Sequence, residues 1–186
     1  MRIIVIFIIF IFCKEVISYE IGSVTNLKIP RMVSLKSNDV NLRVGPSINY
    51  PIKITFIKEN YPVEITDEYD VWRKIIDFKN NEGWVHKSLI RGERYAIITS
   101  EDDLENFIYN FPNIIKIGSI DNNNIVKINR CSAYWCEIKI NNTTGWIKKT
   151  KMWGVYDKEI VNINFTYNIL NYYWKTIVKL NIIDTK

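Results

Sequence analysis

Short alternations of apolar and polar residues recur along most of the chain. Val63-Glu64-Ile65-Thr66 alternates strictly, and the segments 71–75 and 134–138 combine β-branched with aromatic side chains. Asn-rich and Gly-containing runs at residues 80–83 and 141–145 follow these segments and indicate turns. Because long helical periodicity is lacking, the pattern predicts an all-β fold of short strands in an antiparallel barrel or sandwich.

The same pattern occurs twice. A shift of 63 positions, the distance from Trp72 to Trp135, aligns residues 31–75 with 94–138 without a gap. After a one-residue deletion, Gly83-Trp84 aligns with Gly145-Trp146. The identical pairs include Ser37/Ser100, Asp39/Asp102, Ile52/Ile115, Lys53/Lys116, Ile54/Ile117, Ile57/Ile120, Asn60/Asn123, Val63/Val126, Ile65/Ile128, Trp72/Trp135 and Ile75/Ile138. The repeat predicts two copies of one module, residues 31–93 and 94–156.

The first copy carries motifs of a known family. It opens with Val40-Asn41-Leu42-Arg43-Val44-Gly45-Pro46-Ser47, continues through residues 63–72 and closes with Gly83-Trp84-Val85-His86. This arrangement resembles the bacterial SH3 domain family, and the second copy departs from it by opening with residues 101–106, Glu-Asp-Asp-Leu-Glu-Asn. Segments 131–136 and 151–156 are similar to a subset found in exported proteins of alphaproteobacteria. The resemblance implies two tandem five-stranded SH3-like barrels that bind cell-wall peptides or modulate an attached enzyme, and no enzyme is attached here.

Two groups of residues are candidates for structure and binding. Gly83 and Gly145 are expected to form turns, and Trp84 and Trp146 to point into the barrel cores. Arg43 and Ser47 are expected to shape the first loop. Rings in or beside loops often form binding grooves for peptides or sugars, with plain packing as the alternative. These rings are Tyr50, Tyr61, Tyr69, Trp72, Tyr134 and Trp135.

The N-terminus has the pattern of a secretory signal peptide. Arg2 precedes the apolar residues 3–12, and Val16-Ile17-Ser18 follows polar Lys14-Glu15. We expect residues 1–18 to be a signal helix cleaved after Ser18, with an uncleaved anchor as the alternative. The bulky Phe12 argues against a lipid on Cys13. The expected location is therefore the periplasm or cell envelope.

Removal of the signal leaves two of the three cysteines, Cys131 and Cys136. An even pair in an exported chain suggests a disulfide. The equivalent positions of the first copy hold Glu68 and Arg73, an opposite-charge pair. If both pairs join facing strands, the ion pair and the disulfide are alternative solutions to one cross-strand contact, and the two Cα atoms lie about 4.4–6.8 Å apart.

Residues 157–186 fall outside the repeat. Apolar residues alternate with polar ones from Val161 to Ile169, which predicts a strand, and the spacing from Leu170 onward predicts a short amphipathic helix. The segment either docks on the barrels or contacts a membrane or partner. Membrane contact is expected only there or through an uncleaved signal.

The chemistry of the chain favours binding over catalysis. Its one histidine, His86, follows a turn and is expected to be an exposed strand residue rather than a metal ligand or base. The carboxylates at residues 101–105 lack the glycine and oxygen spacing of a calcium loop and indicate a solvated loop. No phosphate loop or nucleophile motif is present, so no enzyme, metal or cofactor is expected. The net charge of +5 is spread along the chain without a basic block. This distribution and the expected export both argue against a nucleic-acid ligand.

These observations predict a non-catalytic exported module that recognises cell-wall peptide or an envelope protein. The alternative is a structural or assembly protein of the periplasm, in which the barrels and the C-terminal segment form a protein interface. An exposed apolar patch on the tail would favour that alternative.

Overall fold

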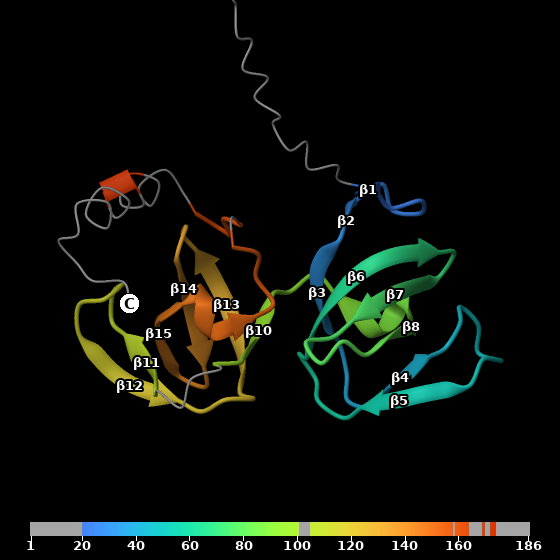
Figure 1. The fold of residues 1–186 in the computed structure, drawn as a ribbon, viewed down its shortest axis with the longest axis horizontal. Helices are drawn as coiled ribbons and strands as arrows, with labels where there is room; N and C mark the ends of the chain where they lie inside the picture. Colours follow the sequence, from blue (N-terminus) through green and yellow to red (C-terminus); the bar gives the residue numbers. More distant parts are fainter. Residues whose placement is uncertain (1–19, 101–104, 158, 164–168, 170–171, 174–186) are drawn as a thin grey trace, which may run out of the picture.

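Two antiparallel β-sheets lie side by side and make up most of the described chain (Figure 1). The computed structural model describes residues 20–100, 105–157, 159–163, 169 and 172–173. The first sheet contains β3 (Arg31–Leu35), β4 (Val40–Arg43), β5 (Ile52–Phe56), β6 (Pro62–Tyr69), β7 (Trp72–Ile76), β8 (Glu82–His86) and β9 (Ile90–Arg91). The second contains β10 (Tyr95–Ile98), β11 (Asn106–Tyr109), β12 (Lys116–Ile120), β13 (Ile125–Cys131), β14 (Trp135–Ile140), β15 (Thr143–Lys148) and β16 (Met152–Trp153). The all-β prediction is confirmed.

Three short elements accompany the sheets. A hairpin of β1 (Glu20–Ile21) and β2 (Lys28–Ile29) precedes the first sheet. The 3-10 helices η1 (Lys87–Leu89) and η2 (Lys149–Lys151) each come directly before the last strand of a sheet.

Both sheets have the same strand order. Neighbouring strands run β5-β4-β8-β7-β6-β3-β9 in the first sheet and β12-β11-β15-β14-β13-β10-β16 in the second. Equivalent backbone hydrogen bonds recur: the Leu35 N–H donates to the Tyr61 carbonyl at 2.9 Å, and the Ile98 N–H donates to the Asn124 carbonyl at 3.0 Å. The predicted repeat is therefore present in the strand topology.

Each sheet buries one face in a core of its own. The first core contains Ile29, Val33, Leu35, Val40, Leu42, Phe56, Val63, Ile65, Ile75 and Val85. The second contains Ala96, Ile98, Ile108, Ile120, Val126, Ile128, Cys131, Cys136, Ile138, Ile147, Met152 and Val161. Successive side chains of a strand point to opposite faces, so every second residue of these strands is available to the outer surface.

The gapless alignment of the two copies is wrong in the opening hairpin. Arg43 pairs with Trp84 and Tyr109 pairs with Trp146, so these residues are equivalent at a shift of 66 (109 − 43). The identity of Ile57 and Ile120 is accidental, because Ile57 is exposed whereas Ile120 lies in the core. Core packing decides the register: Ile108 enters the second core at the position that Leu42 has in the first.

Asparagine supplies the left-handed backbone positions of several turns in this glycine-poor chain. Asn60 and Asn123, an identical pair of the repeat, have φ angles of 67° and 65°. Their N–H groups donate to the carbonyls of Leu35 at 2.9 Å and Ile98 at 2.8 Å. Asparagine tolerates this conformation better than most residues because its short polar side chain bonds locally.

The two sheets contact each other directly. The Tyr156 hydroxyl donates to Glu64 Oε1 of β6 at 2.6 Å, and Lys127 of β13 pairs with Glu93 at 3.1 Å. Burial, together with the hydrogen bond to Glu64, raises the pKa of Tyr156 above its ordinary range. Tyr156 therefore stays protonated as the donor of this bond.

Part of the C-terminal prediction can be compared with the structure. Val161 forms a single β-bridge with Cys131, and the backbone turns at Asn162, whose φ is 48°. Ile169 is helical and exposed, so the predicted strand is wrong at that residue. The signal segment 1–18, residues 164–168 and most of the predicted helix lie outside the described residues. The described residues include no helix with the length and apolarity that a membrane crossing requires.

Asn123→Ala is expected to lower the free energy of unfolding by about 1 kcal/mol, because a residue with a Cβ and no local bond is strained at positive φ. Asn123→Gly should cost little, since glycine adopts this conformation freely. Urea unfolding followed by tryptophan fluorescence measures both, with Asn49→Ala as the control. An Asn123→Ala variant as stable as the parent would contradict the turn assignment.

Candidate functional site

The tryptophans of each copy lie together on the outer face of its sheet. Trp72 of β7 pairs with His86 of β8, and Lys74 pairs with Trp84. Residues that face each other across antiparallel strands share a face, and Val85 and Ile75 occupy the opposite, core face. The first tryptophan face is defined here as Trp72, Trp84, Lys74, His86 and Arg43. The equivalent second tryptophan face is Trp135, Trp146, Glu137, Lys148 and Tyr109.

Trp84 is half-buried on the face opposite the first core, which differs from the expected core position. Trp146 is buried as expected, at 4% exposure, but it lies on the face opposite the second core cluster. Val85 and Ile147, the residues after them, fill the cores. The reason is the close approach of the neighbouring strand at the preceding glycine. A Cβ on Gly83 would lie 2.6 Å from the Arg43 carbonyl oxygen, and one on Gly145 would lie 2.3 Å from a methyl carbon of Ile108. Gly83 and Gly145 lie inside β8 and β15 rather than in turns, so the prediction of turn glycines is wrong. They face inward against β4 and β11, which places Trp84 and Trp146 on the opposite face of each sheet.

The first face is bordered by the β4–β5 loop. Arg43 Nη1 donates to the Tyr50 carbonyl at 2.8 Å, and the Asn49 N–H donates to Ser47 Oγ at 3.2 Å, which agrees with their expected role in shaping the loop. The Tyr50 ring lies where a Cβ on Gly45 would be, 2.7 Å from its atoms, so glycine is needed there. Tyr50 is thereby held beside the first face with 46% of its surface exposed.

The predicted ligand-contacting rings divide into three groups. Tyr69 and Tyr134 are exposed, and Tyr69 pairs in register with Trp72. Trp72 and Trp135 begin strands and are only 7% and 5% exposed. The Tyr61 hydroxyl donates to Asp77 Oδ2 at 3.4 Å, and burial raises its pKa above the ordinary range.

Tyr61 therefore belongs to the interior rather than to the candidate surface. Its ring packs against Phe56, with the centroids 5.2 Å apart, and Phe56 is part of the first core. The structure brings Tyr50, Tyr69 and Trp72 to the first tryptophan face or its border. The structure also places Trp84, Lys74 and His86 on this face. The sequence indicated the shared face of Trp84 and His86 only through the alternation in Trp84-Val85-His86.

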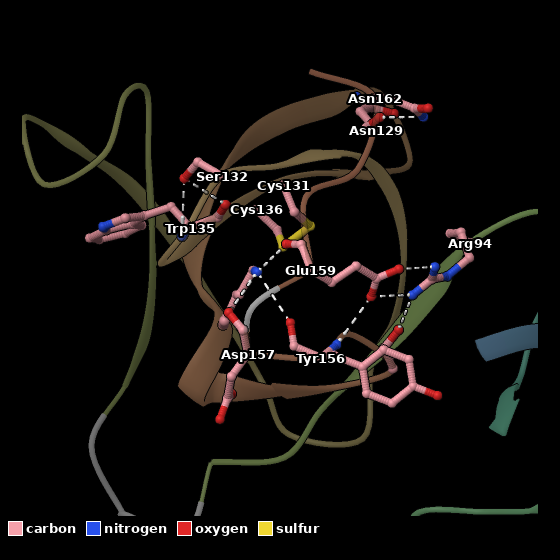
Figure 2. Close-up of a disulfide and its surroundings, with 12 residues drawn as sticks. Arg94, Asn129, Cys131, Ser132, Trp135, Cys136, Tyr156, Asp157, Glu159 and Asn162 are labelled. Atoms are coloured by element: carbon pink, nitrogen blue, oxygen red, sulfur yellow. Dashed lines mark hydrogen bonds and ion pairs between the residues drawn. A yellow bond between two sulfur atoms is a disulfide. The ribbon is translucent and has the colours of Figure 1, made fainter. Parts of the chain in front are cut away.

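The disulfide between Cys131 and Cys136 is confirmed. The two residues are direct partners across β13 and β14, with Cα atoms 4.1 Å apart, slightly below the expected range (Figure 2). Glu68 and Arg73 are partners at the same place in β6 and β7, and Arg73 Nε lies 3.5 Å from Glu68 Oε1. The ion pair and the disulfide therefore occupy equivalent cross-strand positions.

Glu68 holds the N-terminal hairpin against the first sheet. Its buried carboxylate accepts hydrogen bonds from the N–H groups of Val24 at 3.0 Å and Thr25 at 2.8 Å, and from the Thr25 hydroxyl at 2.7 Å. Arg31 Nη2 lies 2.6 Å from Oε1. Burial alone would raise the pKa of Glu68, but these hydrogen bonds outweigh it and hold the pKa at about 2.

The equivalent corner of the second sheet is covered by the segment after β16. Arg94, which corresponds to Arg31, pairs with Glu159, and the Tyr156 N–H donates to the same carboxylate at 3.1 Å (Figure 2). Buried Lys149 donates to the carbonyls of Tyr156 and Asp157, both at 3.2 Å, and of Glu159 at 2.5 Å. Burial lowers the pKa of Lys149, while the nearby carboxylates of Glu159 and Asp157 oppose that change.

Polar chemistry on the candidate surface is sparse. His86 packs edge-on against Trp72 with ring centroids 5.6 Å apart, and its Nδ1 lies 2.7 Å from Ser88 Oγ. In the part of the chain that the structure describes, no three His, Cys, Asp or Glu residues gather as a metal site. Residues 101–104 of the acidic run lie outside that part.

The two antiparallel sheets of like strand order place the chain among small β-rich modules. Residues 36–92 and 120–154 match the family model described as bacterial SH3 domain. These two segments are similar to bacterial SH3 domains, which is consistent with a bacterial SH3-like domain protein. A search of curated proteins returns no match. The matched part of the second copy begins at the last residue of β12, so it leaves out the shifted opening hairpin.

This similarity suggests a binding module rather than an enzyme. SH3-type domains are generally non-catalytic modules that bind proteins or peptides, and bacterial ones are commonly related to the cell wall. The half-buried ring of Trp84 and the half-buried cations of the first tryptophan face suit such a role, because rigid amphipathic rings give contact area at a low entropic cost.

The Glu68 contacts predict an acid-sensitive corner. A carboxyl whose folded pKa lies below its ordinary value of 4.5 stabilises the fold above that pH, and the contribution is lost as the pH falls toward about 2. Unfolding free energies measured at intervals from pH 6 to 2 should show a loss of about 3 kcal/mol from this group at most. Glu68→Gln should be destabilised at pH 6 and lack this loss, whereas the exposed control Glu105→Gln should retain it. Parallel curves for Glu68→Gln and the parent would contradict the assignment.

Proposed function

We propose that the chain is an exported, non-catalytic binding protein of the periplasm or cell envelope. Its two modules, residues 31–93 and 94–156, each close into a small SH3-like barrel, and the first tryptophan face recognises cell-wall peptide or a protein partner. The closure of each sheet into a barrel is supported by the cores, because strands of a single sheet enclose each one. The N-terminal signal pattern and the Cys131–Cys136 disulfide support export, since disulfides persist in oxidising compartments.

The observation that carries this proposal is the placement of Trp84. It is half-buried, so it is held rigidly and still presents ring surface, and Arg43 and Lys74 flank it on the neighbouring strands. Exposed Tyr50 and Tyr69 lie toward the border of the same face. A shallow surface of rings and cations fits an extended peptide, whose apolar groups lie on the rings while its polar groups meet the cations.

A second role, in assembly, is favoured by one observation. Large apolar side chains are exposed along the opening hairpin of both copies, namely Val44, Ile48 and Ile52 in the first and Ile114, Ile115 and Ile117 in the second. Apolar residues grouped in this way are typical of protein interfaces. An envelope protein is the partner that this reading implies.

Retention on purified peptidoglycan tests the leading proposal. The parent protein should be pulled down, and Trp84→Ala should reduce its retention about tenfold. Truncation of a half-buried tryptophan at a binding surface often costs about 1–2 kcal/mol of binding free energy or more. Tyr173→Ala removes an exposed ring far from the face in sequence and serves as the control. Equal retention of Trp84→Ala and the parent would rule out the first tryptophan face as the binding surface, and absence of any retention would leave only the protein partner.

A further inference from the structure

The two tryptophan faces differ in what covers the tryptophan after the glycine. Trp146 is only 4% exposed. The Phe111 ring centroid lies 6.0 Å from its own, and the Arg130 guanidinium lies 5.9 Å away over the ring. Trp84 is half-buried, and among the described residues neither a ring nor a cation is stacked on it. The second face is filled by the chain itself, whereas the first is open.

Both covering groups are absent from the first copy. Phe111 lies two residues beyond Tyr109, the residue that pairs with Trp146; counted in the same way from Arg43, the first copy has Gly45. Arg130 pairs in register with Glu137, and the equivalent pair of the first copy is Asp67 with Lys74. Asp67 does not cover Trp84, because its Oδ1 accepts the backbone N–H of Glu68 at 2.7 Å.

The charges beside the tryptophan are also reversed. Trp146 has Tyr109 and Glu137 on its two sides, and Arg130 Nη2 binds Glu137 at 2.6 Å. Trp84 has Arg43 on β4 and Lys74 on β7. Both strands lie next to β8, so these cations stand on either side of one ring, roughly 10 Å apart at their backbones, within reach of one small anion above it.

Existing contacts leave these cations able to bind. Arg43 uses Nη1 for the Tyr50 carbonyl, which leaves its other N–H groups for a ligand. Lys74 pairs with Glu82, but 35% and 46% of these side chains are exposed. Such a surface pair is worth about 1 kcal/mol or less, so a well-placed carboxylate can replace Glu82.

We propose that the first tryptophan face binds a peptide carboxylate next to an apolar group, with the carboxylate held by Arg43 and Lys74 and the apolar group on Trp84. The second face does not bind this ligand, because Phe111 and Arg130 already cover Trp146, Arg130 is paired with Glu137, and Tyr109 stands where the first face has Arg43. This proposal rests on the proposed function and names the ligand chemistry of the same site. It makes the chain monovalent for peptide despite its two copies.

Two forms of one synthetic stem peptide, L-Ala-γ-D-Glu-L-Lys-D-Ala-D-Ala, provide the test. One has free carboxylates, and the other has both carboxyl groups amidated. Titration calorimetry should show one site, with the free form bound about three- to tenfold more tightly, as expected for one or two charge-assisted contacts. Equal affinity for the two forms would overturn the inference and leave the proposed function standing. Binding of neither form would overturn the inference and remove cell-wall peptide as the ligand.

A matched pair of variants separates a site from general attraction to a cationic protein. Lys74→Gln and Lys79→Gln each remove one positive charge from the first sheet, but Lys79 lies in the β7–β8 loop, over the Phe78 ring. Lys74→Gln should lose the preference for the free form, and Lys79→Gln should keep it. Loss of the preference in both variants, or in neither, would overturn the proposal.

A variant in which the covering side chains of the second tryptophan face are replaced tests why this face does not bind peptide. The substitutions Tyr109→Arg, Phe111→Gly, Arg130→Asp and Glu137→Lys copy the corresponding residues of the first face. The variant, with its circular dichroism and disulfide intact, should bind two peptides per chain. A single site in a folded variant would show that Phe111, Arg130 and Glu137 are not what closes this face. If this variant unfolds, the Lys74→Gln comparison still decides the ligand chemistry.

Discussion

The close approach of β4 to β8 at Gly83, and of β11 to β15 at Gly145, is the constraint on which the rest of the structure depends. Any side chain at either glycine would collide with the neighbouring strand. The strands can pair in this register only with the glycine facing inward, which sends Val85 and Ile147 into the cores and places Trp84 and Trp146 on the opposite face of each sheet. Each copy thus obtains a packed interior and an aromatic outer face from the same three residues.

The two copies join equivalent pairs of facing strands by different chemistry. Glu68 and Arg73 join facing strands through charge in the first copy, and Cys131 and Cys136 do so covalently in the second. Arg31 and Arg94, equivalent in the repeat, both bind a carboxylate that secures a segment outside the repeat. The N-terminal hairpin covers one corner and the segment after β16 covers the other, so each module needs a part of the chain that the repeat does not contain.

The two outer faces differ because the opening hairpins differ in register and because residues at equivalent strand positions differ. The second opening hairpin is shifted relative to the first, which places Phe111 where the first copy has Gly45, and Arg130 replaces Asp67 beside the central residue. These changes leave both cores intact, because all of them lie on the outer face or in a loop. A duplicated sheet can therefore keep its fold while only one copy retains an open surface.

Much of the architecture follows from local pattern: the period-two alternation, the turn residues and the internal repeat predict two like sheets. The even pair of cysteines that remains after the signal segment predicts the disulfide between β13 and β14. Arg43 and Ser47 as loop-shaping residues could also be predicted. The face on which Trp84 lies could not, nor the interior position of Tyr61, nor the shift of the second opening hairpin. Period two tells which residues alternate but not which set is buried; only packing against strands distant in the sequence, here at Gly83 and Gly145, makes that choice.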